Sequence, residues 1–330
     1  MSELSLVTGG FGFIGNELVR QLSKTTDVVI LDNRTRVATK IEDIANVPVY
    51  DVDITDQQAI ADVIRKLKPS AVFHLAAIHY IPECNANPER TIHTNVEATL
   101  SLLRACSGSG VKHFLFASSG AVYTDAPHPL SESAPTLPVD IYGWSKLHAE
   151  QLCAWHSIVE GLPVTICRVF NNYGPRETNA HIIPEIISQL RQGSTLHLGN
   201  ITARRDYIHV SDTARALRML SACVPVAGES RVVNISSGQH ATVGELIRMI
   251  SGILDWQIEI VRDERRFRRA DKQVQIADVA LLQALAAWTR SIELKDGLRN
   301  LLEFEGFLPA RDSSRLGKVS QVSGAGSLHR

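Results

Sequence analysis

A tyrosine and a lysine stand four positions apart, at Tyr142 and Lys146, in the segment YGWSK. On a helix, residues i and i+4 lie on the same face, so the two side chains can share one site. A phenol has a pKa of about 10, and a neighbouring ammonium group lowers that pKa because it favours the phenolate. The pair therefore predicts a tyrosine that accepts and donates a proton in a reaction, although a Tyr–Lys pair on an ordinary helix surface has the same spacing.

A glycine-rich turn near the start of the chain is typical of a phosphate-binding site. Three glycines spaced GxxGxxG follow an apolar run at 4–7, which predicts a strand, and open a helical pattern at 12–23. Glycines in these places allow a tight turn and let the backbone approach a pyrophosphate, and the N–H groups at the helix start attract the same anion. The turn therefore predicts a dinucleotide-binding site. Its predicted contacts with the cofactor are Gly9, Gly12, Phe13, Ile14 and Gly15.

An acidic residue ends the second apolar run. Asp32 follows the predicted strand 28–31, and Asn33 stands next to it. A carboxylate at this distance behind the glycine turn binds the adenosine ribose hydroxyls and repels a 2′-phosphate. Asp32 and Asn33 therefore predict NAD as the cofactor in preference to NADP. The alternative for Asp32 is an ordinary turn or cap residue.

The order of the predicted elements explains how these residues come together. Strands are predicted at 4–7, 28–31, 47–50, 71–75, 113–117 and 164–167, and helices at 12–23, 56–66, 95–106 and 142–159. Repeated strand–helix units with short apolar strands predict an α/β fold of the Rossmann type, a doubly wound parallel sheet with helices on both faces. Such folds bind their ligands at the carboxyl ends of the strands, which is where the glycine turn and Asp32 lie.

The pattern changes after residue 170, so residues 1–170 are predicted to form the NAD-binding domain. Residues 171–308 are predicted to form a smaller α/β lobe that binds the substrate, with 205–222 as a segment that could return to the first domain. Helices in this part are predicted at 182–192, 211–222, 243–253 and 291–304. The Ser-, Gly- and Arg-rich residues 309–330 have no periodicity and predict a disordered tail.

The composition of the 330 residues limits the classes of function. Hydrophobic residues make up 44% and charged residues 21%, with a formal net charge of −1. This balance argues against a disordered chain and against a general attraction to nucleic acid or membrane surfaces. Five cysteines without a CxxC motif and twelve scattered histidines predict no metal site. Because no leader sequence and no long apolar run are found, we expect a soluble protein of the cytoplasm.

Three further motifs make the chain resemble a known family. SSGAVY at 118–123 follows a predicted strand, RVFNNYGPR occupies 168–176, and RRDYIHVSD occupies 204–212. Together with the glycine turn and YGWSK, they resemble the extended short-chain dehydrogenase/reductase family, in particular its NAD-dependent nucleotide-sugar epimerases and dehydratases such as UDP-glucose 4-epimerase. The resemblance covers about residues 4–305.

The resemblance implies roles for individual residues. Ser119 aligns with the hydroxyl that hydrogen-bonds the reacting sugar oxygen, and it joins Tyr142 and Lys146 as a catalytic residue; the latter two also contact NAD. Further implied contacts with NAD are Asp53, Ile54, Leu75, Ala76 and Ala77. Implied contacts with the substrate, besides Ser119, are Asn171, Arg205 and Arg269. The resemblance also implies a homodimer formed through helices 95–106 and 142–159.

The two residues after Ser119 narrow the predicted reaction. Dehydratases that resemble this chain have Asp and Glu there, and related decarboxylases keep the Glu, whereas Gly120 and Ala121 cannot transfer a proton. We therefore expect an NAD-dependent 4-epimerase that acts on a nucleoside-diphosphate sugar, a UDP-hexose or UDP-hexuronate, through a transient 4-keto sugar. The open alternatives are a decarboxylase or dehydratase with a base from elsewhere, an NAD(P)H-dependent keto-sugar reductase, and a nucleotide-binding regulator without turnover.

Three polar residues near these motifs are predicted to have no part in the chemistry. Asp206 is expected to fix its loop, and Asp212 to cap the helix at 211–222. His79 is expected to be an ordinary loop residue.

Overall fold

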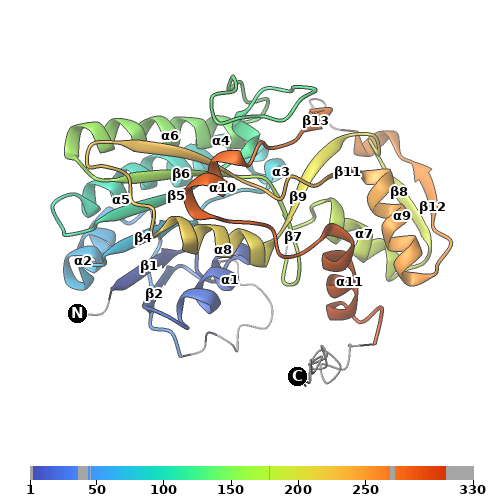
Figure 1. Cartoon of the computed structure of the whole chain (residues 1–330), viewed down its shortest axis with the longest axis horizontal. Coiled ribbons are helices and arrows are strands. Elements are labelled where there is room, and N and C mark those ends of the chain that lie inside the picture. The colour runs from blue at the N-terminus through green and yellow to red at the C-terminus, as the bar shows by residue number, and fades with distance from the viewer. Residues whose placement is uncertain (1–2, 36–43, 45, 178, 268–271, 310–330) are drawn as a thin grey trace, which may run out of the picture.

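A seven-stranded parallel sheet forms the centre of the larger part of the molecule (Figure 1). The computed structural model describes residues 3–35, 44, 46–177, 179–267 and 272–309. Across the sheet the strands are β10 (Ser230–Ile235), β6 (Val164–Val169), β5 (His113–Ser119), β4 (Ala71–His74), β1 (Leu4–Thr8), β2 (Asp27–Asp32) and β3 (Val49–Asp51). Six of these strands follow the order 3-2-1-4-5-6 of dinucleotide-binding folds. The predicted fold class is confirmed.

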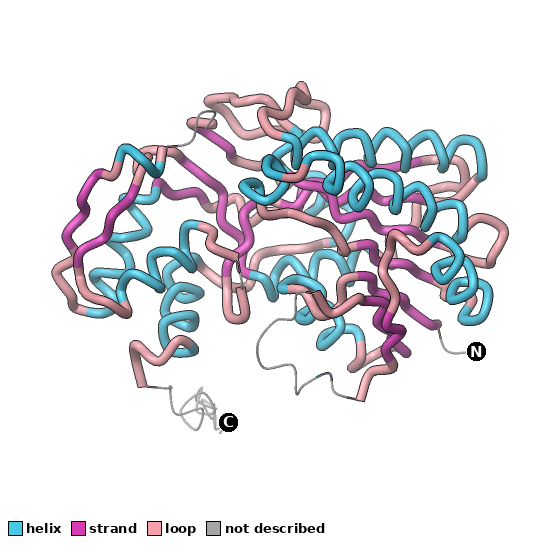
Figure 2. Tube along the Cα trace, turned by 180° about the vertical axis from the view of Figure 1, so that it is seen from behind, coloured by secondary structure: helices cyan, strands magenta, loops and turns pink. Residues whose placement is uncertain are grey.

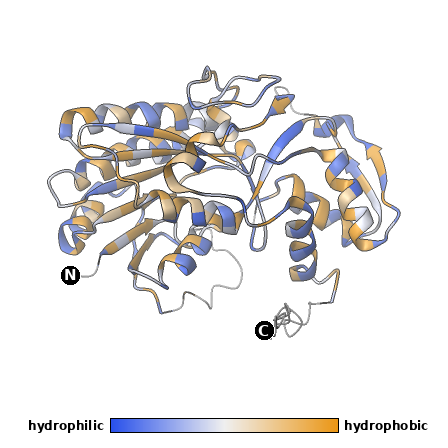
Figure 3. Cartoon of the chain, in the orientation of Figure 1, coloured by the Kyte–Doolittle hydropathy of each residue, from blue (hydrophilic) through white to orange (hydrophobic). Residues whose placement is uncertain are grey.

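Helices cover both faces of this sheet because side chains of successive strand residues point to opposite sides. Leu6 packs with one set of helices, and its neighbour Val7 packs with the other. The helices on the Leu6 side are α2 (Gln57–Leu67), α5 (Ala98–Cys106) and α6 (Ile141–Glu160), and those on the Val7 side are α1 (Phe13–Leu22), α8 (Val210–Leu220) and α10 (Ala280–Ala286). Figure 3 shows mostly hydrophobic strands between them.

Three of these elements come from beyond residue 170. β10 is an edge strand of the large sheet, α8 packs on α1, and α10 packs on α8 and β10. A division of the chain at residue 170 therefore separates β10 and α10 from this sheet, whereas α8 falls within 205–222, the segment given as one that could return to the first domain. The reason is that β10 extends the sheet by parallel pairing with β6, a pairing that chain order alone does not reveal.

The smaller part of the molecule is built on β9 (Arg204–His209), which pairs with β7 (Asn171–Tyr173), β11 (His240–Thr242) and β13 (Val274–Gln275). Its other elements are the strand pair β8 (Thr195–Leu198) and β12 (Glu259–Arg262) and the helices α7 (Ile182–Leu190), α9 (Val243–Leu254) and α11 (Leu294–Phe304). These helices share a separate hydrophobic core with β8 and β9. Figure 2 shows this smaller part beside the part that contains the large sheet.

Short elements that the sequence did not predict lie near the strand ends. They are the helices α3 (Ile81–Ala86) and α4 (Pro88–Ile92), the π-helical turn η2 (His93–Glu97) and the 3-10 turns η3 (Gly120–Val122) and η4 (Glu264–Arg266). The helix expected at 95–106 thus begins as a π-helical turn before α5. From residue 310 on, the predicted tail lies outside the described residues.

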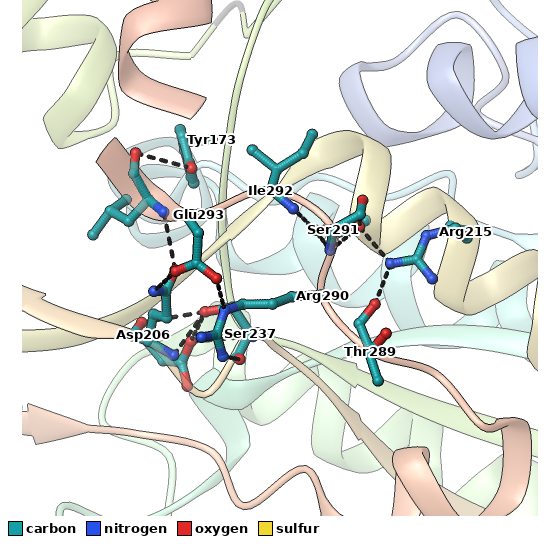
Figure 4. Close-up of polar contacts among 12 residues, drawn as sticks. Tyr173, Asp206, Arg215, Ser237, Thr289, Arg290, Ser291, Ile292 and Glu293 are labelled. Atoms are coloured by element: carbon teal, nitrogen blue, oxygen red, sulfur yellow. Dashed lines mark hydrogen bonds and ion pairs between the residues drawn. The ribbon is translucent and has the colours of Figure 1, made fainter. Parts of the chain in front are cut away.

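The two aspartates expected to be structural hold long-range contacts (Figure 4). Asp206 accepts hydrogen bonds from Ser237 and from the N–H of Ala277, as predicted for a residue that fixes its loop. Asp212 does not cap α8: His209 does, and Asp212 instead accepts N–H groups of the 291–292 turn and pairs with Arg215. The first turn of α8 already has its cap, so this carboxylate is available to a distant turn.

Candidate active site

A single cleft brings the predicted residues together. It has a volume of about 680 Å³ and is lined by the carboxyl ends of the large sheet and by β7, β9 and α7 of the smaller part. The predicted site residues that line it are Gly9, Gly12, Phe13, Ile14, Gly15, Asp32, Asn33, Asp53, Ile54, Leu75, Ala76, Ala77, Ser119, Tyr142, Lys146, Asn171 and Arg205. Arg269 lies outside the described residues. In the described part of the chain, no group of His, Cys, Asp and Glu is arranged to hold a metal ion.

The glycine turn packs so closely against neighbouring backbone that two of its positions have no room for a side chain. Gly9 has φ +71°, and a Cβ there would lie 2.8 Å from the backbone nitrogen of Ala76. A Cβ on Gly15 would lie 2.0 Å from the carbonyl oxygen of Gly9. Gly12 is the N-cap of α1 and has no side chain to bond the first N–H groups of the helix. These groups face the cleft and fit the phosphates of a dinucleotide.

Asp32 is held in place by the backbone. Its carboxylate accepts N–H groups from Phe11 at 3.0 Å and from Arg34 at 2.7 Å. Burial raises the pKa of Asp32, and these two hydrogen bonds oppose the rise. Beside it, the amide of Asn33 donates to Asp53 at 2.8 Å, which joins the two residues predicted at the adenosine end. A fixed carboxylate at this place fits ribose hydroxyl donors.

The phenol of Tyr142 lies near the start of α6, which Asp140 caps through a hydrogen bond from the N–H of Gly143 at 2.8 Å. Burial raises the pKa of Tyr142, and a hydrogen bond with Ser119 opposes the rise. Ser119 itself is the N-cap of η3, where its hydroxyl accepts the N–H of Ala121 at 3.1 Å. The end of β5 and the first turn of α6 thus place a hydroxyl and a phenol together, as the resemblance implied.

Lys146 shares the cleft with Tyr142, but its ammonium group bonds elsewhere. It donates to the carbonyl oxygen of Ala117 at 2.8 Å and lies 4.8 Å from the ring centre of Phe116. Burial lowers the pKa of Lys146 to about 8. Lys146 and Tyr142 thus line the same cleft one helical turn apart on α6, with the ammonium group held at the carboxyl end of β5.

The motifs and the fold are those of a known protein family. A model described as the NAD dependent epimerase/dehydratase family matches residues 5–236. The chain belongs to this family. It is 34% identical over 315 residues to GDP-6-deoxy-D-mannose reductase of Pseudomonas aeruginosa. This match covers 92% of this chain and 97% of the relative. It is 29% identical over 308 residues to UDP-glucose 4-epimerase of Streptomyces lividans, covering 88% and 92%.

Solved structures of the family have the same fold. UDP-glucose 4-epimerase of Thermotoga maritima, solved with UDP-glucose, superposes with a TM-score of 0.83 at 28% identity and covers 91% of this chain and 98% of that one. The Thermus thermophilus UDP-glucose 4-epimerase, solved with NAD, gives 0.81 at 26% identity and covers 92% and 99%. The predicted family and the predicted cofactor, NAD, are confirmed. Family members modify nucleoside-diphosphate sugars.

Sequence reasoning missed several polar residues that the epimerase/dehydratase fold brings into or beside the cleft. Asn95 in η2 is buried, and its amide bonds the carbonyl of Ile78 at 2.8 Å and the hydroxyl of Ser145 at 3.0 Å. It ties the loop after β4 to α6 one turn from Tyr142. Nothing in the sequence around Asn95 marks it, because its partners come from two other segments.

A second missed group lies between the loop after β4 and the loop before α7. His79 bonds Asn179 at 2.8 Å, its ring lies 5.9 Å from that of His181, and His181 pairs with Glu177 at 3.6 Å. His79, His181 and Glu177 line the cleft. His79, expected to be an ordinary loop residue, thus lies in the wall of the cleft and bonds a residue of another loop. The GPRETNAH segment carried a weak signal, since it combines titratable residues with a motif of the family.

The buried carboxylate of Asp32 allows a test of the cofactor contacts. Replacing Asp32 with Asn keeps the size and removes the charge, so we expect the Kd for NAD to rise by about 10- to 100-fold, as for loss of a charged hydrogen bond. Titration of the variant with NAD and NADP by calorimetry measures this. Asp51→Asn, at a carboxylate with 68% side-chain exposure in the next strand, is the control. An unchanged Kd for NAD would contradict the assigned contact.

Proposed function

We propose that this protein is an NAD-dependent nucleoside-diphosphate-sugar 4-epimerase. The supporting observation is that Tyr142 and Ser119 meet in the cleft, while the two residues after Ser119 are Gly120 and Ala121. A 4-epimerase needs one group that removes and returns the proton of the sugar 4-hydroxyl, and Tyr142 is placed for that. It needs no separate acid and base for the loss of water.

In the proposed reaction, Tyr142 accepts the proton of the 4-hydroxyl while the Ser119 hydroxyl hydrogen-bonds the same oxygen. NAD held by the glycine turn and Asp32 would supply reversible hydride transfer at C4. Asn171 and Arg205 hold the diphosphate, so the 4-keto sugar can turn over inside the cleft before Tyr142 gives the proton back. Asn171 is itself fixed, since its amide donates to the carbonyl of Asp206 at 3.1 Å. The reaction has no net redox change.

The direct test is to incubate the purified protein, without added cofactor, with UDP-glucose, UDP-N-acetylglucosamine, UDP-glucuronate and GDP-mannose. Proton NMR then follows the configuration at C4. We expect conversion of at least one sugar to its 4-epimer at constant absorbance at 340 nm. Absence of any 4-epimer with all four sugars would contradict the proposal.

A keto-sugar reductase is the second candidate, because the 34% identical relative is named as a GDP-sugar reductase. Tyr142 would then donate its proton to a carbonyl oxygen, using the same contacts. Stoichiometric oxidation of added NADH in the presence of a GDP-4-keto sugar would favour this activity.

The alternative of a decarboxylase or dehydratase requires a base from elsewhere, and Glu177 and His181 are such groups in the cleft. Loss of carbon dioxide or water from the product, seen by mass spectrometry, would identify it.

We also propose that the protein is a homodimer through α6. This helix packs beside α5 and leaves four large apolar side chains on the surface: Trp144, Trp155, Ile158 and Val159. Their spacing places them along one side of the helix. Exposed apolar patches of this kind mark contact surfaces between proteins.

No helix in the described ranges is long and apolar enough to cross a bilayer.

The proposed dimer is tested by placing a carboxylate in the apolar surface of α6. Ile158 is 70% exposed, so Ile158→Glu should leave the fold intact and convert a dimer into a monomer, because the carboxylate would be buried unpaired in the interface. Light scattering after size-exclusion chromatography gives the mass. Val226→Glu, at a residue that is 67% exposed and distant in sequence from α6, should remain dimeric. A dimeric Ile158→Glu variant, or a monomeric wild type, would overturn this assignment.

A further inference from the structure

A lysine that neither the motifs nor the proposed chemistry use lies at the wall of the cleft. The ammonium group of Lys272 donates to the carbonyl oxygen of Ala121 at 2.8 Å and to that of Tyr123. Three residues on, the amide of Gln275 donates to the carbonyl oxygen of Gly120 at 2.5 Å. Two side chains, one from just before β13 and one from its end, thus hold the turn that follows Ser119, about 150 residues earlier in the chain.

The same segment is joined to the strand that carries Arg205. β13 pairs in parallel with β9, and Gln275 lies opposite Arg205 in that pairing. On the other side, the carboxylate of Asp125 accepts the N–H groups of Gln273 and Val274, each at 2.9 Å. Lys272 is therefore placed between the sugar end of the cleft, at Ser119, and the end where Arg205 lies.

The charge of Lys272 has no anionic hydrogen-bond partner among the described residues. Lys272 is only 7% exposed, and it lines the cleft. An ammonium group has three N–H bonds, and the carbonyls of Ala121 and Tyr123 take two of them. Burial lowers the pKa of Lys272 to about 8, and the positive charge of Arg205 adds to this, whereas the carboxylates of Asp140 and Asp125 oppose it. A buried cation next to a second cation is costly unless an anion joins them.

We propose that Lys272 is an anion-binding residue of the cleft, which donates its third N–H to an anionic oxygen of the nucleotide sugar. The proposal rests on the proposed function, since it assumes that a nucleoside-diphosphate sugar occupies the cleft. Two parts of such a ligand carry anionic oxygens: the diphosphate, present in every substrate of this class, and the carboxylate of a hexuronate. A charge-assisted hydrogen bond to either would be strong because the site is shielded from water.

The test uses a pair of variants that differ in charge and keep a donor. Lys272→Gln retains an N–H that can bond a carbonyl but is neutral, and Lys272→Arg retains the positive charge. Calorimetric titration of the NAD-loaded protein measures the Kd of UDP, GDP, UDP-glucose and UDP-glucuronate. Lys295→Gln removes an exposed lysine of α11 and serves as the control.

For the ligands that wild type binds, we expect Lys272→Gln to weaken binding by about tenfold or more and Lys272→Arg to retain most of it. Weaker binding of UDP or GDP and their sugars alike identifies the diphosphate as the partner; weaker binding of UDP-glucuronate alone identifies the sugar carboxylate. If wild type binds these ligands and both variants behave alike, Lys272 only holds the Ser119 turn and the inference is wrong. If wild type binds none of them, the proposed function itself fails.

Discussion

Replacing Tyr142 with phenylalanine is expected to leave a folded, NAD-binding protein whose turnover falls by about 10²- to 10⁴-fold, the range for loss of a general acid–base group. The phenyl ring fills the same space in the first turn of α6, so the cap by Asp140 and the packing are retained. Only the phenol oxygen that meets Ser119 is lost. The measurement is kcat with the sugar that wild type converts, together with the Kd for NAD.

The control for this variant is Tyr50→Phe. Tyr50 lies on the edge strand β3 and does not line the cleft, so its removal should leave kcat within about twofold. An unchanged NAD affinity in Tyr142→Phe separates loss of chemistry from loss of the cofactor. If Tyr142→Phe kept near-full turnover, Tyr142 would not be the proton-transfer group and the proposed mechanism would be wrong.

Replacing Glu150 with glutamine is expected to lower the free energy of unfolding by about 3–5 kcal/mol, the range for breaking one side of a buried ion pair. Glu150 on α6 and Arg168 on β6 pair at 2.7 Å, with side-chain exposures of 5% and 7%. Burial alone would lower the pKa of Arg168, but the hydrogen bonds and charge of Glu150 outweigh it and raise that pKa. Glutamine leaves the guanidinium group buried without its counter-charge. Chemical denaturation measures the change.

The same carboxylate supports the active site. The hydroxyl of Ser118 donates to Glu150, so β5 is fixed to α6 one residue before Ser119. We therefore expect Glu150→Gln to lower kcat as well as stability. The double variant Glu150→Leu with Arg168→Met removes both charges and should recover most of the stability. If Glu150→Gln unfolded at the same denaturant concentration as wild type, the pair would contribute nothing measurable.

Sequence alone predicted the features that depend on neighbours in the chain. The spacing of Gly9, Gly12 and Gly15 predicts a turn between a strand and a helix because only backbone approach within a few residues is involved. The four-residue spacing of Tyr142 and Lys146 put both on the cleft side of α6 because a helix repeats every 3.6 residues. The alternation of apolar runs and helical patterns predicted a doubly wound sheet because each run is long enough for one buried strand and each pattern for one covering helix. Each of these depends on local geometry, which the sequence encodes directly.

The tertiary structure decided everything that depends on contacts between distant segments. It paired β10 with β6 at the edge of the large sheet, directed the ammonium of Lys146 to Ala117, and placed Lys272 on the turn after Ser119. These partners were not predictable because no periodic pattern relates residues of different secondary-structure elements that are far apart in the chain. Their pairing follows from which buried donors and acceptors remain unsatisfied once the sheets have packed. The sequence thus determined the fold and the cofactor, and the packing of the large sheet against the smaller part of the molecule determined which side chains surround the cofactor site.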